Sequence, residues 1–326
     1  MWPFVLIAIY CFFVALASLA GGMLPSLIRL THTRMQLILS TVGGLVLGVG
    51  MLHLLPHSIA ETESVDYSVW AALAGLLAMF FLIRIFQVHH HGPVDETSDH
   101  QCDHDHTGAK CDHHDHIPID GEDCDTHRHP YSWIGLCVGL TLHTLFDGVA
   151  IAASVSAESL HPDRAGMLLG FGTFMAVLLH KPLDAMSITT VMAAGGWSPR
   201  SRQLVNIGFA LTNALGAGIF CLGIQQFIQN QHLVIGLALG FAAGVFVCIA
   251  LADILPELQF HRHDRIKLSA ALMTGVLLAY AIGFVESPHQ HEHATSPPDS
   301  HAADDAADGQ HDDYDRNHDH AGHDHP

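Results

Sequence analysis

Basic residues are scarce in this chain, and their scarcity argues against several functions. The 326 residues include 13 Lys and Arg against 32 Asp and Glu, which gives a formal net charge of −19 when histidine is neutral. A chain with this excess of negative charge is a poor partner for nucleic acid. The sequence also contains no Walker-type phosphate loop, so nothing in it indicates direct ATP drive.

Cysteine is also infrequent, with seven residues in the chain. Four of the cysteines lie in apolar segments and are interpreted as small packing residues: Cys11, Cys137, Cys221 and Cys248. The other three lie in a polar stretch rich in His and Asp: Cys102, Cys111 and Cys124. We interpret these three as soft metal ligands rather than as disulfides.

Long apolar segments make up most of what remains. Hydrophobic residues are 49% of the chain and the mean hydropathy is +0.30, although two long stretches are almost entirely polar. Eight segments are long and apolar enough to cross a bilayer as helices. They cover about residues 6–28, 37–59, 69–88, 133–155, 165–194, 204–228, 233–258 and 266–285. The predicted fold is therefore an all-α polytopic membrane protein, with three transmembrane helices in residues 1–88 and five in residues 131–286.

The basic residues predict the orientation of these helices. Ten of the 13 lie in or beside the connections after the first, third, fifth and seventh segments, whereas the opposite side has only Arg164 and Arg316. The positive-inside rule then places both termini outside the cytoplasm. No Lys or Arg precedes the first segment, which favours a retained helix over a signal peptide. We expect an integral protein of the cell (plasma or inner) membrane.

Two polar stretches interrupt or follow the apolar segments. Residues 89–130 form a predicted cytoplasmic loop with eleven His, eleven acidic residues and three Cys, and residues 287–326 form a predicted external tail with nine His and ten acidic residues. Such compositions predict disorder and metal binding, with a solvated spacer as the alternative. The loop residues expected to capture metal are Cys102, His104, His106, Cys111, His113, His114 and His116.

Two His–Asp pairs lie inside predicted membrane helices. His143 and Asp147 are four residues apart, and so are His180 and Asp184, so each pair occupies one face of a helix. Ionisable side chains at membrane depth cost at least about 2.5–3.5 kcal/mol unless they face a partner, a cavity or an ion. Imidazole and carboxylate together suit divalent zinc, iron, manganese or nickel. The four residues are therefore the predicted metal ligands.

Two further pairs with the same spacing lie near helix ends, each beside a proline. His53 and His57 flank Pro56, while Asp253 and Glu257 flank Pro256. We place these four residues on a metal pathway, with interfacial solvation as the alternative. Glycines repeated at four-residue spacing predict a tightly packed bundle and allow a homodimer.

The chain resembles a known family over nearly all its length, and the segment 133–155 carries one of the matching motifs. The ZIP (Zrt- and Irt-like) divalent-metal transporters carry HNxxDG there, and His143, Asp147 and Gly148 match that motif. Thr144 replaces the Asn, which places Thr144 on the transport pathway. The strings HLLPHS at 53–58 and DILPE at 253–257 are also similar to ZIP sequences.

The segment 165–194 both matches and departs from this family. ZIP proteins usually carry HExxH followed by Glu; His180 matches the first position, Asp184 supplies a carboxylate at the end of the motif, and Lys181 stands where Glu is expected. The resemblance implies alternating-access transport of a divalent metal into the cytoplasm, with Zn²⁺ as the substrate, Fe²⁺, Mn²⁺ and Cd²⁺ as open alternatives, and no organic cofactor. Because Lys181 brings a positive charge, we expect one metal at the site, with the ammonium in place of a second.

Three other classes of membrane protein share some of these features. A cation diffusion facilitator exporter would have six helices and a folded cytoplasmic domain. An intramembrane metallohydrolase would need a general base, and Lys181 stands at the position of that base. A metal sensor that does not transport would fit the paired ligands as well. The sequence thus favours a transporter over an enzyme.

Overall fold

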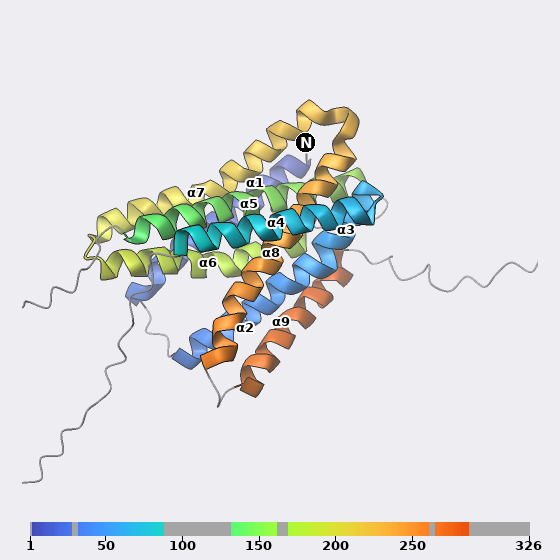
Figure 1. Cartoon of the computed structure of the whole chain (residues 1–326). Helices are drawn as coiled ribbons and strands as arrows, with labels where there is room; N and C mark the ends of the chain where they lie inside the picture. Colours follow the sequence, from blue (N-terminus) through green and yellow to red (C-terminus); the bar gives the residue numbers. More distant parts are fainter. Residues whose placement is uncertain (1, 28–31, 88–131, 162–168, 261–264, 287–326) are drawn as a thin grey trace, which may run out of the picture. The chain divides into compact units, whose positions relative to one another are not determined.

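The computed structural model describes residues 2–27, 32–87, 132–161, 169–260 and 265–286, which belong to one compact unit. These residues are almost entirely helical, as predicted (Figure 1). The predicted loop 89–130 and the predicted tail 287–326 both lie outside the described residues.

The order of the helices follows the apolar segments of the sequence. Two short pieces interrupt the α-helices, a π-helical turn η1 and a 3₁₀ turn η3. The elements are α1 (Trp2–Leu27), α2 (His32–Val49), η1 (Gly50–Leu54), α3 (Leu55–Thr62), α4 (Val65–Gln87), α5 (Ser132–Leu160), α6 (Phe171–Ala194), α7 (Pro199–Ile224), η3 (Gln225–Asn230), α8 (Gln231–Phe260) and α9 (Arg265–Glu286).

Within the described residues, six helical stretches are long and apolar enough to cross a membrane. One of them, Pro199–Ala252, contains two of the predicted segments, because η3 joins α7 to α8 without a break. Helix α6 is not among the six, although it has 24 residues. The prediction of a helical membrane protein is confirmed, while the count of eight spans and the side of each terminus stay predictions.

Apolar side chains lie both inside the bundle and on its surface. The buried set draws on most of the helices and includes Val14, Leu45, Ile151, Ile235 and Phe246. Many large apolar side chains on α1, α4, α7 and α9 are nevertheless exposed, up to 87% for Ile266. Because soluble proteins rarely leave contiguous apolar surface uncovered, these faces are suited to contact lipid.

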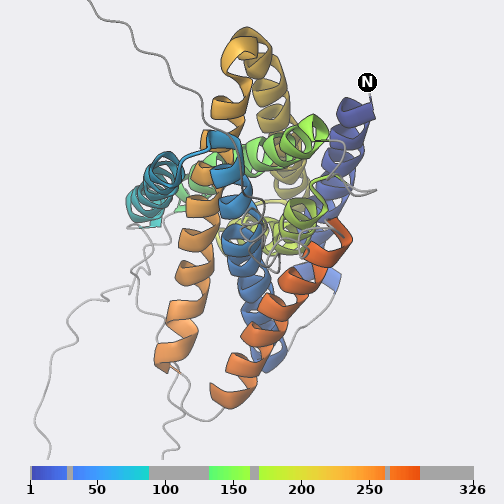
Figure 2. The same ribbon diagram turned by 90° about the vertical axis from the view of Figure 1, so that its right-hand side faces the viewer.

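Close contacts at glycine hold several helix pairs together, as the four-residue spacing predicts. A side chain on Gly44 would collide with the backbone of Leu272, which brings α2 against α9, and these two helices lie side by side in Figures 1 and 2. Helices α5 and α7 approach reciprocally, since a side chain on Gly148 would meet Asn213 and one on Gly216 would meet Leu145. Gly148 directly follows Asp147, so this contact fixes α7 at the level of the predicted metal ligands.

Two prolines lie close to predicted functional residues, Pro56 beside His53 and His57, and Pro182 between His180 and Asp184. Before Pro56 the chain forms the π-helical turn η1, in which the Leu55 amide donates to the carbonyl of Gly50. Pro182 lies inside α6, where α1 packs so closely that a side chain on Gly21 would overlap the proline backbone. Turns of π-helix and internal prolines disturb the regular hydrogen-bond ladder of a helix.

Candidate metal centre

The four predicted ligands come together between the middles of α5 and α6. His143 and Asp147 project from α5, and His180 and Asp184 from α6, with one ligand atom from each lying within 4.8 Å of the others. The side chains of His143, Asp147 and His180 are at most 5% exposed, and that of Asp184 is 16% exposed. The i, i+4 spacing on each helix therefore produces one buried cluster rather than two separate pairs.

The distances within the cluster suit a small divalent cation. Nε2 of His143 lies 3.5 Å from Oδ2 of both Asp147 and Asp184, and Nε2 of His180 lies 3.4 and 3.9 Å from the same two oxygens. In a tetrahedral zinc site with bonds near 2.0–2.1 Å, neighbouring ligand atoms are about 3.3 Å apart. The four nitrogen–oxygen edges of the cluster are thus within about 0.6 Å of the length that a tetrahedral zinc site requires.

The tautomer of the neutral His180 ring is set by a contact within its own helix. Its Nδ1 lies 2.8 Å from the carbonyl oxygen of Ala176, which can only accept a hydrogen bond. In a neutral ring the proton is then on Nδ1, and Nε2 presents its lone pair to the cluster. Within the described part of the chain, Nε2 of His143 and Oδ1 of Asp147 are buried without a hydrogen-bond partner. Unpartnered buried polar atoms of this kind are expected where an ion binds.

Lys181 reaches the same cluster and is fully buried. Its Nζ donates to Oδ2 of Asp147 at 2.7 Å, to Oδ2 of Asp184 at 3.3 Å, and to Oγ1 of Thr144 at 2.7 Å. Nζ also lies 5.1 Å from the centre of the Phe209 ring, over its face. Lys181 does not point toward lipid or solvent, but forms ion pairs with both carboxylates.

Thr144 serves as an outer partner of this lysine. Its hydroxyl donates to the carbonyl of Leu140 at 2.7 Å and accepts from Lys181. A threonine that gives its proton to its own helix can only accept from a neighbour, which orients the ammonium between the two carboxylates. Thr144, which stands where the family motif has Asn, therefore contacts the cluster through Lys181.

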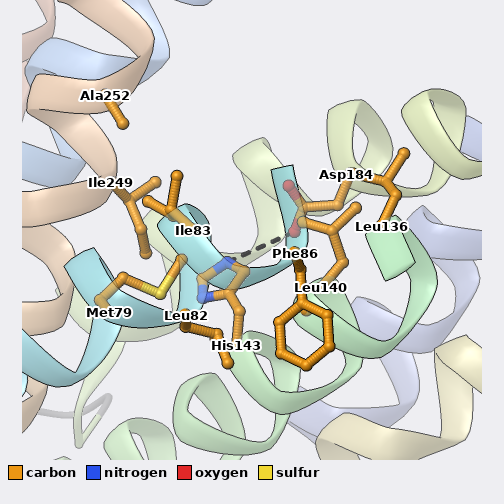
Figure 3. A pocket seen from close by; sticks show the side chains of 11 residues that line it. Met79, Leu82, Ile83, Phe86, Leu136, Leu140, His143, Asp184, Ile249 and Ala252 are labelled. Atoms are coloured by element: carbon orange, nitrogen blue, oxygen red, sulfur yellow. Dashed lines mark ion pairs between the residues drawn. The ribbon is translucent and has the colours of Figure 1, made fainter. Parts of the chain in front are cut away.

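A cavity of about 90 Å³ opens onto two of the four ligands. Figure 3 shows the His143 ring pointing toward the Asp184 carboxylate, with apolar side chains around them. The lining residues come from α4, α5, α6 and α8: Met79, Leu82, Ile83, Phe86, Leu136, Gly139, Leu140, His143, Asp184, Ile249 and Ala252. A cavity of this volume has room for several water molecules, so it can hold a hydrated ion next to the ligands.

Of the predicted pathway residues, Thr144 reaches this cluster through Lys181, whereas His53 and His57 are not part of it. His53 is buried in η1, where its Nε2 donates to the carbonyl of Ala279 in α9 at 2.8 Å, and His57 is half-buried in α3. Asp253 and Glu257 lie in α8, but their side chains are outside the described residues. The predicted loop ligands between Cys102 and His116 are outside them as well. The role of these residues in a pathway stays a prediction.

Sequence reasoning missed a second cluster of metal-ligand side chains. Glu61, His161 and His232 offer ligand atoms within 4.8 Å of one another, although they are far apart in the sequence. No local spacing joins them, and only the position of each residue at a helix end could have suggested a meeting.

Apolar helices around a buried quartet of His and Asp side chains, which could hold a metal ion, define a class, the helical membrane proteins with ionisable side chains inside the bundle. Within this class, the chain belongs to the ZIP zinc transporter family, whose sequence pattern it matches over residues 5–283. The match covers every described helix that contributes to the site, and it confirms the family resemblance. Because this is a family of transporters, the prediction of a transporter instead of an enzyme is confirmed at the level of the family.

Individual relatives are similar over shorter regions. The zinc transporter zipt-7.2 of Caenorhabditis elegans is 28% identical over 162 residues, 48% of this chain and 32% of the relative. The zinc transporter ZIP1 of Danio rerio is 28% identical over 175 residues, 53% of this chain and 52% of the relative. The zinc transporter ZIP9 of Micropogonias undulatus is 28% identical over 147 residues, which are 44% of this chain and 45% of the relative. The aligned region thus spans a third to a half of these relatives.

Proposed function

We propose that this protein transports a divalent metal ion, with zinc as the substrate, through the site between α5 and α6. The observation that carries the proposal is the ligand set itself. Two imidazoles and two carboxylates from two helices lie buried with nitrogen–oxygen distances of 3.4–3.9 Å, close to the edges of a tetrahedral zinc site. Membership of the ZIP zinc transporter family supports zinc over Fe²⁺, Mn²⁺ and Cd²⁺.

The transport step requires that the site open to one side at a time. The cavity reaches His143 and Asp184 and is lined by Phe86, Leu136 and Ala252. These three residues lie toward helix ends that the distribution of Lys and Arg predicts to be cytoplasmic. We infer that the cavity is the release path and that the structure is open to the cytoplasm. The inward direction of flux is what the family resemblance implies.

The polar stretches would serve this transport from both sides. The acidic tail 287–326 would concentrate cations outside, and the loop 89–130 would receive them in the cytoplasm, with Asp253 next to the cavity residue Ala252 as a waypoint. The partners of the protein are then the metal ion and the lipid bilayer of the plasma or inner membrane, and a homodimer remains compatible with the exposed apolar faces.

Uptake into proteoliposomes of known orientation, followed with a zinc dye inside, tests the proposal. The parent should fill the vesicles, whereas His143→Ala and Asp184→Ala should each slow uptake at least about tenfold. Loss of a residue that only supports a metal ligand already costs about 10–100-fold, so loss of a ligand itself should cost no less. Asp66→Ala removes an exposed carboxylate at the start of α4 and should leave uptake unchanged. Binding of zinc without uptake by the parent would instead indicate a sensor.

Filling the cavity should block release without removing a ligand. Leu136→Trp adds volume inside the cavity, so we expect zinc uptake to fall about tenfold while zinc still raises the melting temperature as it does in the parent. Ile134→Trp places the same side chain on the exposed face of α5 and is the matched control. Unchanged uptake by Leu136→Trp would contradict the assignment of this cavity as the release path.

A further inference from the structure

Glu61, His161 and His232 converge from three separate elements at one end of the bundle. Glu61 is in the last turn of α3, His161 directly follows α5, and His232 is the second residue of α8. Oε1 of Glu61 lies 3.0 Å from Nε2 of His161, and Oε2 lies 2.7 Å from Nδ1 of His232. The two rings are 5.9 Å apart and tilted by 48°, so both face the carboxylate without stacking flat on each other.

The packing of α8 on α3 explains how His232 reaches Glu61. The Ser58 hydroxyl donates to the carbonyl of Gly236 at 2.7 Å, and a side chain on Gly236 would collide with Thr62. His232 precedes Gly236 by one helical turn, so it lies over the end of α3. The backbone contact between the two helices is therefore what holds the imidazole against the carboxylate.

The exposure of the three side chains is uneven in a way that suits a ligand. Glu61 is 3% exposed, whereas His161 and His232 are 43% and 59% exposed. A buried carboxylate is costly unless a cation or a full set of hydrogen bonds compensates it, while the exposed rings leave a way in for an ion from water.

We propose that these three residues form a second divalent-metal site, distinct from the one between α5 and α6. Two imidazole nitrogens and one carboxylate are a ligand set typical of zinc, with an open position for water. On binding, each imidazole proton moves to the other ring nitrogen, as neutral histidine permits, and the nitrogen now facing Glu61 presents a lone pair to the metal. The ion then neutralises the buried carboxylate.

The two sites are well separated. His161 lies 18 positions after His143, which along an α-helix corresponds to about 27 Å. No side chain can therefore serve both sites, and the second stands whether or not the protein transports. The connections that contain Glu61, His161 and the start of α8 are those that the charge distribution predicts to be non-cytoplasmic. The alternative is a hydrogen-bonded triad that joins three helix ends without metal.

Modification of histidines by diethylpyrocarbonate, mapped by mass spectrometry, separates these possibilities. The full chain is purified in detergent and labelled at free Zn²⁺ concentrations fixed by a chelator, so that other histidines do not deplete the metal. We expect Zn²⁺ to protect His161 and His232 with one common midpoint. Glu61→Gln, which keeps the shape of the side chain, should raise that midpoint at least tenfold.

Controls make the outcome decisive. Glu63→Gln changes an exposed glutamate two residues away and should leave the midpoint unchanged, as should His143→Ala, which reports on the transport site alone. His232→Ala alters an exposed ring, so it should fold normally, and it should abolish the protection of His161. No protection in the parent, or protection that is the same in Glu61→Gln, would overturn the second site without bearing on the first.

Discussion

Asp147→Asn should abolish zinc uptake and destabilise the protein. A single oxygen of Asp147 faces His143 at 3.5 Å, His180 at 3.4 Å and Lys181 at 2.7 Å, so neutralising it removes one of four ligands and the nearest counter-ion of a buried ammonium. Breaking one partner of a buried ion pair costs about 3–5 kcal/mol, and we expect uptake to fall at least about a hundredfold. Proteoliposome uptake and thermal unfolding measure the two effects.

A double variant separates these two consequences. Asp147→Asn combined with Lys181→Met removes both charges of the 2.7 Å pair, so the unfolding temperature should return toward that of the parent while uptake stays lost. Asp66→Asn, at an exposed carboxylate, is the matched single control. Near-normal uptake by Asp147→Asn would remove the argument that this carboxylate binds the transported ion.

Lys181→Glu should convert a site for one ion into a site for two. The ammonium lies 2.7 Å from Asp147 and 3.3 Å from Asp184, where it repels a second cation and supplies one positive charge in its place. A glutamate at this position brings a third carboxylate beside the same two oxygens. Crystals soaked in Zn²⁺ should show two anomalous peaks at the site in this variant and one in the parent.

Lys181→Met is the control for this substitution. It removes the ammonium without adding a ligand, so we expect one peak, as in the parent. Because the count is made at the site itself, zinc bound by histidines elsewhere does not affect it. A single peak in Lys181→Glu would show that the lysine does not determine how many ions bind.

The parts of the structure that could be predicted are those that depend on local spacing. The helices follow from apolar segments of sufficient length, and the quartet of His143, Asp147, His180 and Asp184 follows from two i, i+4 pairs that must avoid lipid. The sequence also placed Lys181 near the carboxylates, and its ammonium forms ion pairs with both, while its role in place of a second metal stays a prediction. Each of these features is encoded within a few residues.

Features that depend on distant contacts could not be predicted in this way. Glu61 is 100 positions from His161 and 171 from His232, and the three meet only because α8 packs on α3 at Gly236. Pro56 indicated a broken helix, but not that the irregularity would be the π-helical turn η1 before it. The apolar lining of the cavity likewise depends on how four helices pack.

The contacts of Lys181 have a consequence for the return half of the proposed cycle. After the ion leaves, Asp147 and Asp184 still face an ammonium that is tethered to α6, so two carboxylates and one lysine leave a net charge of −1 rather than −2. Moving charge through a medium of low dielectric is costly, and the Lys181 ammonium halves the net charge of the empty site. In the proposed cycle, the empty site would therefore return with Lys181 as its counter-ion and would not need a cation from solution.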